Sequence, residues 1–494
     1  MAVAIERYHF TDADHARFRE QLALELEVLR TLLARRGFGD GAASLGAEVE
    51  FFLADEAGRA CHRNVELREA ARDGRLCLEL ARFDLELNLT PVAAAGAPFA
   101  ALRAELEDCL EKVRACGAAC GARPVTIGIL PTLTPADLGH HALTDAPRYH
   151  ALSEKVLAES HGRQVIRIAG EDPLELRWPE VTLEGACASF QLHLRVSPAD
   201  YARVYNAAQL VTPLALAIGA NSPLFLGHRL WDETRVALFK QSVEMRDFEL
   251  TSWRAPARVA FGHGWVREGA WELFAESVAL HAPIMPIASE EDATAVLATG
   301  GTPRLAALRL HQGTIWRWNR AIYDPAGGGH LRIEFRALPS GPTPADMLAN
   351  GALLAGLAAG LAPRMDELLP ALPFGYAERN FYRAAQAGLG ATLLWPSRLA
   401  PSPRERDVPS LLAELLPCAD EGLAALGVEA ADRARTLGVI ERRLALGLSP
   451  ARWLRRTYEA LCRRLPGPAA IGELTRRYAE LAATGTPLHE WPAP

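Results

Sequence analysis

Four short stretches of the chain alternate polar and apolar residues, and their polar positions carry chemically active side chains. In residues 45–53, Glu48 and Glu50 share one face, because successive side chains of a strand point to opposite sides of a sheet. The other three faces carry Asp84, Glu86 and Asn88; Gln191, His193 and Arg195; and Arg332, Glu334 and Arg336. Any one of them could be an ordinary half-exposed sheet. Four together indicate a shared polar site.

If these faces converge, their side chains describe a phosphoryl-transfer site. Carboxylates that face one another repel, so their pKa values would rise unless cations lie between them. Mg²⁺ and Mn²⁺ take carboxylate oxygens as ligands, and one imidazole is compatible with such a set, especially for Mn²⁺. Arginines on the same surface match the oxygens of phosphate. Catalysis at such a site consists of positioning and charge neutralisation.

The common nucleotide-binding and hydrolase motifs are absent from the sequence. It contains no G-x-x-x-x-G-K-[ST], and no G-x-G-x-x-G that joins a strand to a helix, so neither a P-loop nor a Rossmann domain is predicted. H-E-x-x-H and G-x-S-x-G are also missing, which weakens a metalloprotease or an α/β-hydrolase interpretation.

Composition narrows the class of partner. The 494 residues carry a formal net charge of -7, which argues against nucleic acid and anionic membranes. Only three of the 53 basic residues are lysines, a bias that we attribute mainly to codon usage. The eight cysteines form no C-x-x-C pair and, with no apparent secretory signal, predict a cytoplasmic location. The uncharged stretch at 206–227 contains Pro213 and predicts a buried helix rather than a membrane span.

The periodicities predict an α+β fold with a mostly antiparallel, curved sheet. Strands are predicted within residues 45–53, 77–90, 189–196, 304–320 and 330–338. Gly327, Gly328 and Gly329 predict a hairpin turn. Helices are predicted for residues 99–117, 149–160, 198–218, 271–280 and 343–361, and for a stretch after Asp12 or Asp14 as N-cap.

Three regions are expected along the chain. Residues 1–44 form an N-terminal helix packed on the body, residues 45–400 form the catalytic domain, and residues 401–494 form a helical C-terminal region without strands.

The ordered motifs resemble those of glutamate–cysteine ligases, and specifically the bacterial carboxylate–amine ligase branch, whose catalytic domain is similar to that of glutamine synthetase. The motifs are Gly46-Ala47-Glu48-Val49-Glu50, Glu86-Leu87-Asn88-Leu89-Thr90-Pro91, Gln191-Leu192-His193 and Arg332-Ile333-Glu334-Phe335-Arg336. The block from His311 to Arg320 and the block Asn380-Phe381-Tyr382 support them. The likeness covers about residues 45–400, and its specificity lies in the order of the set.

The resemblance implies an ATP-dependent ligase that phosphorylates the side-chain carboxylate of an amino acid, expected to be glutamate. An amine, typically that of cysteine, then attacks the acyl phosphate and leaves an amide, ADP and phosphate, a step of glutathione biosynthesis. The implied ligands of Mg²⁺ or Mn²⁺ are Glu48, Glu50, Glu86, His193 and Glu334. Arg336 and Glu334 are the implied catalytic residues, and Gln191, Arg148, Tyr149, Asn221 and Arg235 the implied contacts to substrate or ATP. Glu79 could add a further carboxylate.

Several alternatives remain open at this stage. The same chemistry could use another amine, since no residue can be identified that reads a thiol. A two-metal hydrolase would act without ATP, and a non-catalytic nucleotide-binding regulator would usually lack metal ligands that are present here. Trp316 and Trp318 could wall a ligand or belong to the core. Small-molecule substrates are the expected partners, and a homo-oligomer is left open.

Overall fold

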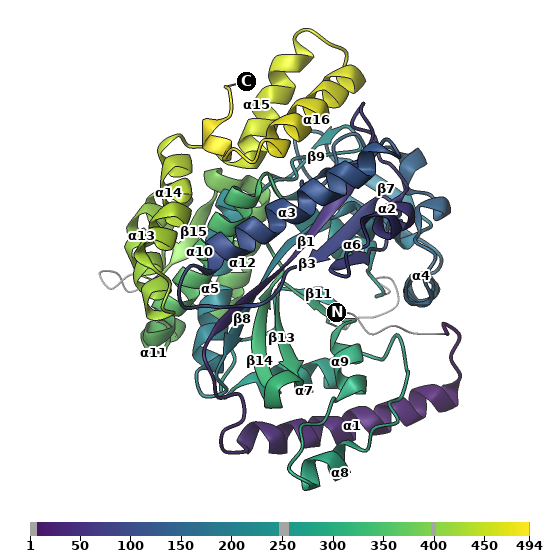
Figure 1. Cartoon of the computed structure of the whole chain (residues 1–494), viewed down its shortest axis with the longest axis vertical. Coiled ribbons are helices and arrows are strands. Elements are labelled where there is room, and N and C mark those ends of the chain that lie inside the picture. Colours follow the sequence, from purple (N-terminus) through teal and green to yellow (C-terminus); the bar gives the residue numbers. More distant parts are fainter. Residues whose placement is uncertain (1–6, 247–255, 397–401, 494) are drawn as a thin grey trace.

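The structure is a computed structural model that describes residues 7–246, 256–396 and 402–493. Its centre is a curved antiparallel sheet with strand order β13-β14-β8-β1-β3-β2 (Figure 1). These strands are β1 (Ser44–Ala54), β2 (Leu76–Leu78), β3 (Asp84–Asn88), β8 (Phe190–Val196), β13 (Asn319–Asp324) and β14 (His330–Phe335). Two short strands, β4 (Val92–Ala93) and β5 (Arg123–Val125), also pair with β1. The predicted α+β class with a curved antiparallel sheet is confirmed.

Helices surround the sheet and account for most of the remaining chain. The α-helices are α1 (Asp12–Ala34), α2 (Asn64–Ala71), α3 (Pro98–Ala118), α4 (Pro147–Glu159), α5 (Tyr201–Gly219), α6 (Thr234–Ser242), α7 (Ala270–Leu280), α8 (Ala293–Ala298), α9 (Ala306–Gln312), α10 (Pro344–Leu361), α11 (Met365–Leu368), α12 (Phe374–Ala387), α13 (Val408–Ala425), α14 (Ala430–Ala445), α15 (Pro450–Cys462) and α16 (Gly467–Ala483). Four small two-stranded ladders complete the fold: β6 (Gln164–Ile168) with β7 (Leu174–Trp178), β9 (Leu224–Phe225) with β10 (His228–Arg229), β11 (Val259–Ala260) with β12 (Trp316–Arg317), and β15 (Thr392–Trp395) with β16 (Arg404–Asp407).

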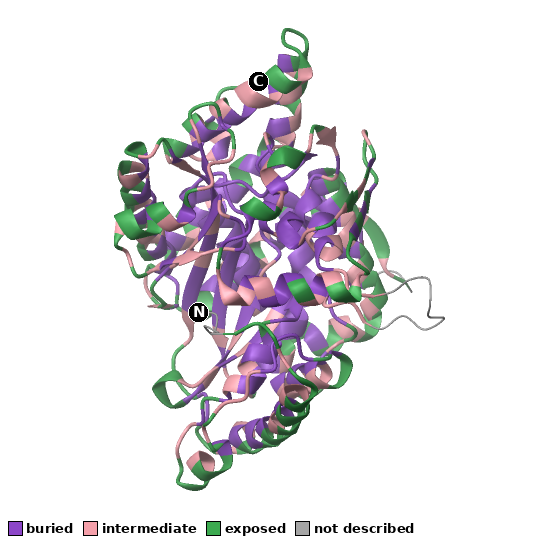
Figure 2. Ribbon diagram, turned by 90° about the vertical axis from the view of Figure 1, so that its right-hand side faces the viewer, coloured by how far each residue is buried: buried purple, intermediate pink, exposed green. Residues whose placement is uncertain are grey.

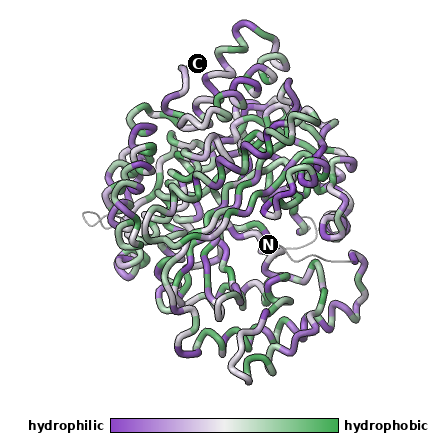
Figure 3. Tube along the Cα trace, in the orientation of Figure 1, coloured by the Kyte–Doolittle hydropathy of each residue, from purple (hydrophilic) through white to green (hydrophobic). Residues whose placement is uncertain are grey.

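The two faces of the sheet differ sharply in polarity. The apolar alternation positions of β8 and β14 are buried, and Gly351 of α10 lies close enough for a Cβ there to meet the ring of Phe190. On the β13–β14 side, Tyr201 and Tyr205 of α5 donate hydrogen bonds to backbone carbonyls of Arg332 and Asn319. Buried residues therefore fill the space behind the sheet, while exposed residues collect on the outer helices (Figure 2). Hydrophilic residues are frequent along outer helices such as α1 and α14 (Figure 3).

Two long apolar helices belong to this core. α5 is buried almost throughout, as predicted for residues 206–227. One stretch, Pro344–Ala371, is long and apolar enough to cross a membrane, but 89% of its most apolar window is buried inside the protein. That degree of burial is typical of a core helix.

Helix α1 confirms the predicted N-terminal helix, with one correction to its start. The N-cap is Thr11, whose hydroxyl accepts from the Asp14 N–H, while the Asp14 carboxylate accepts from the Thr11 N–H. This reciprocal capping box satisfies two backbone donors. The N-cap therefore lies one residue before Asp12 and three before Asp14, the two predicted caps. Its apolar stripe, including Phe18, Leu22 and Leu29, packs toward α7, α8 and α9 below the sheet (Figure 1).

Three strand predictions need correction. Residues 304–320 are not one strand, because 306–312 form α9. Glu25 of α1 is buried and accepts a hydrogen bond from the Leu308 N–H, so a distant residue supports the beginning of this helix. Residues 77–90 form two strands, β2 and β3, joined by a turn. A strand also occurs after residue 401, since β16 pairs with β15. The predicted boundary at residues 400 and 401 lies outside the described residues.

Candidate active site

The four polar faces predicted from the sequence lie side by side on one surface of the sheet. Strand register places Glu50 opposite Glu86, Glu48 opposite Gln191, and His193 opposite Glu334. These residues line a cavity of about 340 Å³, within the range of small-molecule sites. Helices α4, α7 and α9 contribute further lining residues.

One half of this surface, on β8, β13 and β14, is neutralised by the protein's own cations, and we call it the arginine-paired half. Arg320 donates to both carboxylate oxygens of Glu334, at 2.6 and 3.0 Å. Arg336 donates from Nη1 to Glu334 at 3.0 Å and to the amide oxygen of Gln191 at 2.5 Å. Although burial alone would raise the pKa of Glu334, the two arginines hold it well below its usual value. Glu334 is therefore ionised and fixed in place.

Gln191 connects the arginine-paired half to β1. Its amide nitrogen donates to Glu50 at 3.1 Å, while its oxygen accepts from Arg336. Glu50 also accepts from the backbone N–H of Ser189 at 2.5 Å. The orientations of Arg336 and Glu50 are thus coupled through one amide.

Glu48, His193 and Glu334 form a compact group of ligand atoms. One ligand atom from each lies within 4.8 Å of the others, and His193 Nε2 lies 3.2 Å from a Glu48 oxygen. Both ring nitrogens of His193 are buried, and neither has a hydrogen bond to the described residues. Two carboxylates and an imidazole whose Nε2 faces both of them are a donor set that fits Mn²⁺ or Mg²⁺.

The other half, the acidic half, gathers carboxylates that have few cations beside them. It comprises Glu50, Glu79, Asp84, Glu86 and Glu184, which lie on β1, on β3, after β2 and in a 3₁₀ turn at Val181–Ala186. Burial and the neighbouring carboxylate of Glu79 raise the pKa of Glu50 to about 7. Burial and the same neighbour raise the pKa of Glu184 to about 8.

Glu86 and Asp84 show the same imbalance more strongly. Burial, and then Glu48 for Glu86 and Glu50 for Asp84, raises both pKa values well above their usual range. Oδ1 of Asp84 is buried without a hydrogen-bond partner among the described residues. Buried charges of one sign are stable only when cations or protons neutralise them. The acidic half therefore also fits divalent cations.

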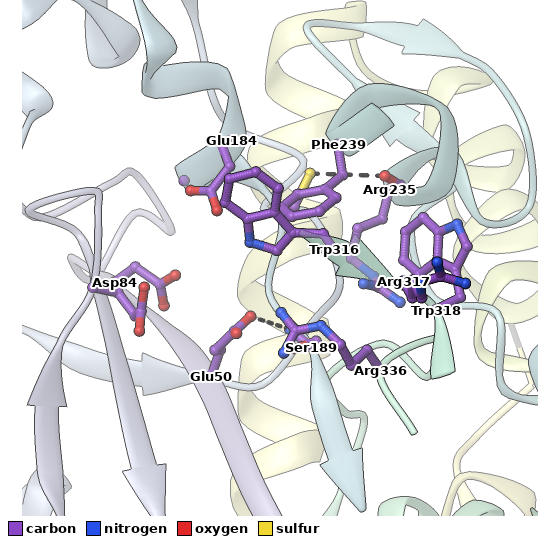
Figure 4. A pocket seen from close by; sticks show the side chains of 13 residues that line it. Glu50, Asp84, Glu184, Ser189, Arg235, Phe239, Trp316, Arg317, Trp318 and Arg336 are labelled. Carbon is purple, nitrogen blue, oxygen red and sulfur yellow. Dashed lines mark hydrogen bonds between the residues drawn. The ribbon is translucent and has the colours of Figure 1, made fainter. Parts of the chain in front are cut away.

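A smaller pocket adjoins the cavity beyond Glu50. In Figure 4, Glu50, Asp84 and Glu184 lie on one side, and Arg235, Arg317 and Arg336 on the other, with Trp316 between them. Trp316 and Trp318 were expected either to wall a ligand site or to belong to the core. They do both, since they are buried and line this pocket.

Arg235 lines only the smaller pocket and is held by structural partners. Its Nε donates to the buried Glu233 at 3.0 Å, and another N–H donates to the backbone carbonyl of Ala337. Its guanidinium lies 5.6 Å from the centre of the Trp318 ring. Substrate contacts would have to use the N–H groups that remain.

Arg148 and Tyr149, at the first turn of α4, cover the acidic half. The Tyr149 hydroxyl donates to the backbone carbonyl of Leu78 at 2.8 Å. The Arg148 guanidinium lies 5.0 Å from the Tyr149 ring and, among the described residues, forms no hydrogen bond or ion pair. Arg148 is thus a cation available to an anionic ligand.

Of the residues predicted for the site, one lines neither the cavity nor the smaller pocket. Asn221 is fully buried, and its amide nitrogen donates to the carbonyl of Ser340 and to the hydroxyl of Tyr478. The others line the cavity or the smaller pocket: Glu48, Glu50, Glu86, Arg148, Tyr149, Gln191, His193, Arg235, Glu334 and Arg336.

Four polar residues are among the lining residues that sequence reasoning missed. Arg320 shares one face of β13 with Ile322, but the predicted strand ended at residue 320. Glu184 lies in a 3₁₀ turn, where no strand or helix period marks it. Arg309 and Gln312 lie on α9, which was predicted as strand.

Solved structures that are similar to this chain include two bacterial enzymes. A glutamate–cysteine ligase from Francisella tularensis in complex with AMP matches with a TM-score of 0.52 and 11% identity, covering 92% of this chain and 91% of that chain. A bifunctional glutathione synthetase from Pasteurella multocida matches with a TM-score of 0.51 and 12% identity, covering 95% of this chain and 55% of that chain. At these identities the likeness shows a common fold.

Sequence comparison supplies the family. No curated protein matches the chain significantly. The profile of glutamate-cysteine ligase family 2 matches residues 44–480, which include β1, β3, β8 and β14 with their polar faces. The chain therefore belongs to glutamate-cysteine ligase family 2 and is an ATP-dependent carboxylate–amine ligase.

Proposed function

We propose that this protein joins the side-chain carboxylate of glutamate to the amine of cysteine, with ATP as the phosphoryl donor and γ-glutamylcysteine, ADP and phosphate as products. The observation that carries the proposal is one continuous surface that places unneutralised carboxylates beside Arg336 and Glu334. A phosphoryl-transfer site needs both kinds of residue. The carboxylates hold the cations that offset the charge of the triphosphate, and the arginine contacts the transferring phosphoryl group.

The reaction consists of two balanced steps. A carboxylate oxygen of glutamate attacks the γ-phosphorus of ATP, the bond to the β-phosphate oxygen breaks, and ADP leaves. The amine nitrogen then attacks the acyl carbon and loses a proton, and phosphate leaves with the oxygen that came from the carboxylate. The amide is the product.

Mg²⁺ or Mn²⁺ held by Glu48, Glu50, Glu86, His193 and Glu334, with Glu79 as a further carboxylate, would neutralise phosphate charge. The chain's own residues do the positioning. Glu334 and Gln191 fix one edge of the Arg336 guanidinium, so its remaining N–H groups are oriented before substrate arrives. Donors that are already oriented stabilise developing charge without reorganisation.

Arg148 is the proposed partner of a substrate carboxylate, and Tyr149 holds the first turn of α4 beside it. A guanidinium binds a carboxylate through two parallel hydrogen bonds. We keep Arg235 as a further substrate contact through its free N–H groups. Asn221 would act only indirectly, by holding the segment before Arg235 through its bonds to Ser340 and Tyr478.

The eight cysteines are all free, which supports a reducing cytoplasm as the location. The proposed catalytic domain spans residues 45–400, with an N-terminal helix before it and the C-terminal helices after it.

The direct test is an assay of the full-length protein with ATP, Mg²⁺ and single additions from a panel of amino acids and amines. ADP and amide should form together only when glutamate and cysteine are both present. Glutamate-dependent turnover with another amine would replace cysteine as the acceptor. Turnover without ATP would favour a hydrolase, and nucleotide binding without any turnover would favour a regulator.

A further inference from the structure

Besides Arg309 and Arg320, the elements α9 and β13, together with α7 and the segment after it, contribute an apolar wall to the cavity. Phe274, Met285, Leu310 and Ile322 form this wall, and three of them are buried. None of these side chains can bind phosphate or a metal ion. This wall is suited to a flat, largely apolar part of a ligand.

A single buried amide interrupts this apolar wall. Gln312, the last residue of α9, lines the cavity and is 3% exposed. Neither its amide oxygen nor its amide nitrogen has a hydrogen-bond partner among the described residues. A buried polar group left without a partner is destabilising, so such an amide calls for an explanation.

Gln209 is a buried glutamine with a structural role, and it provides a comparison for the hydrogen bonding of Gln312. Gln209 is 1% exposed, its nitrogen donates to the carbonyl of Phe261 at 2.6 Å, and its oxygen accepts from Asn319 at 2.6 Å. Both ends of that amide are satisfied within the protein. Gln312 has the same burial and neither bond.

The backbone that carries Gln312 is fixed from both sides. The neighbouring His311 side chain bonds to the carbonyl of Ser277 on α7 at 3.0 Å. Glu25 of α1 accepts from the Leu308 N–H at 2.8 Å at the other end of α9. The position of the Gln312 amide is therefore set by the fold.

We propose that Gln312 binds the adenine base of ATP, and that the wall formed by Phe274, Met285, Leu310 and Ile322 accommodates the ring. A glutamine amide offers one acceptor and one donor side by side. The adenine edge presents the complementary pair, the N6 amino group and a ring nitrogen, and can be bound through two hydrogen bonds. This inference rests on the proposed use of ATP.

The test compares ATP with purine riboside triphosphate, which lacks the N6 amino group, in calorimetric binding to the full-length protein with Mg²⁺. Wild type should prefer ATP. Gln312→Met should bind ATP at least about tenfold more weakly, the effect of about 1.4 kcal/mol, and should lose the preference between the two nucleotides. The KM for glutamate should stay unchanged.

A purely structural role for Gln312 predicts a lower melting temperature for ligand-free Gln312→Met. The proposal predicts no fall, because Met removes a buried amide that has no hydrogen-bond partner in the part of the chain that the structure describes. If Gln312→Met does not fold, Gln312→Glu keeps the size and the acceptor for the N6 amino group but lacks the donor to the ring nitrogen. It should therefore bind both nucleotides more weakly and keep the preference for ATP. Equal ATP affinity of wild type and variant, or an effect on glutamate alone, overturns the inference and leaves the proposed function standing. A wild type that binds no nucleotide overturns both.

Discussion

The two halves of the cavity surface hold similar carboxylates in opposite electrostatic states. In the arginine-paired half, Glu334 is buried against Arg320 and Arg336, and its pKa lies well below the usual value. In the acidic half, Glu86 is half-buried with an amide and other carboxylates near it, and its pKa lies well above the usual value. Because Glu334 is the more buried of the two, burial alone would raise its pKa at least as much, so neighbouring charge makes the difference.

In the arginine-paired half, the protein itself supplies the charges that neutralise the carboxylate. In the acidic half, those charges must come from bound ligands or protons. The arginine-paired half is a finished network whose members depend on one another for charge balance. The acidic half is balanced only by protons or added cations. Substitutions in the two halves should therefore have similar effects on catalysis and opposite effects on stability.

The largest effect is expected for Glu334→Gln. It removes a proposed metal ligand and leaves Arg320 and Arg336 short of a buried counter-charge. Turnover should fall roughly 100-fold or more, and unfolding free energy by about 3 kcal/mol. Steady-state kinetics and denaturant unfolding measure the two quantities. Near-wild-type turnover would show that Glu334 is not part of the site.

Glu86→Gln should lower turnover by a factor similar to that of Glu334→Gln, but it should not lower stability. In the absence of divalent ions it removes a repelling carboxylate, so the melting temperature should stay level or rise. Glu69→Gln, on the exposed face of α2, is the matched control and should change neither quantity. A large drop in the melting temperature of Glu86→Gln would mean that the acidic half is already neutralised.

Arg148→Gln addresses the main cation over the acidic half. Loss of one charge-assisted hydrogen bond, worth about 1.5–3 kcal/mol, should raise the KM for the amino-acid substrate roughly tenfold or more. The KM for ATP should change much less. An equal rise in both constants would indicate that Arg148 shapes the whole cavity rather than binding one substrate.

The smallest effect concerns pH and Glu184. Its pKa of about 8 exceeds the usual 4.5, so between these values the metal-free folded protein holds a proton that the unfolded chain releases. Stability should therefore fall as the pH rises from about 5 to 8. The melting temperature should drop by a few degrees, and less in Glu184→Gln than in Glu69→Gln. Identical slopes in the two variants would contradict the assignment.

Most of the site could be predicted because its strands keep strict alternation. Alternation assigns each of the following residues to the polar face of its own strand: Glu48, Glu50, Glu86, His193 and Glu334. The register then brings the four faces together. The arginine-paired network was predictable only in part. Arg336 lay within a recognised strand, whereas Arg320 stood at the end of a segment predicted with the wrong structure.

The missed residues depend on contacts between distant parts of the chain. Residues 306–312 form a helix whose first turn is supported by Glu25, and no local pattern shows that partner. Gln312 and Arg309 were therefore placed on a strand that does not exist. Glu184 belongs to a 3₁₀ turn with no period to follow. The boundaries proposed at residues 44 and 400 stay predictions.

The most direct measurement of the central claim follows oxygen from substrate to product. Glutamate labelled with ¹⁸O in its side-chain carboxylate is turned over with ATP, Mg²⁺ and cysteine, and the released phosphate is analysed by mass. Formation of an acyl phosphate predicts one ¹⁸O atom in each phosphate, together with one amide and one ADP. Phosphate without label would contradict the proposed reaction.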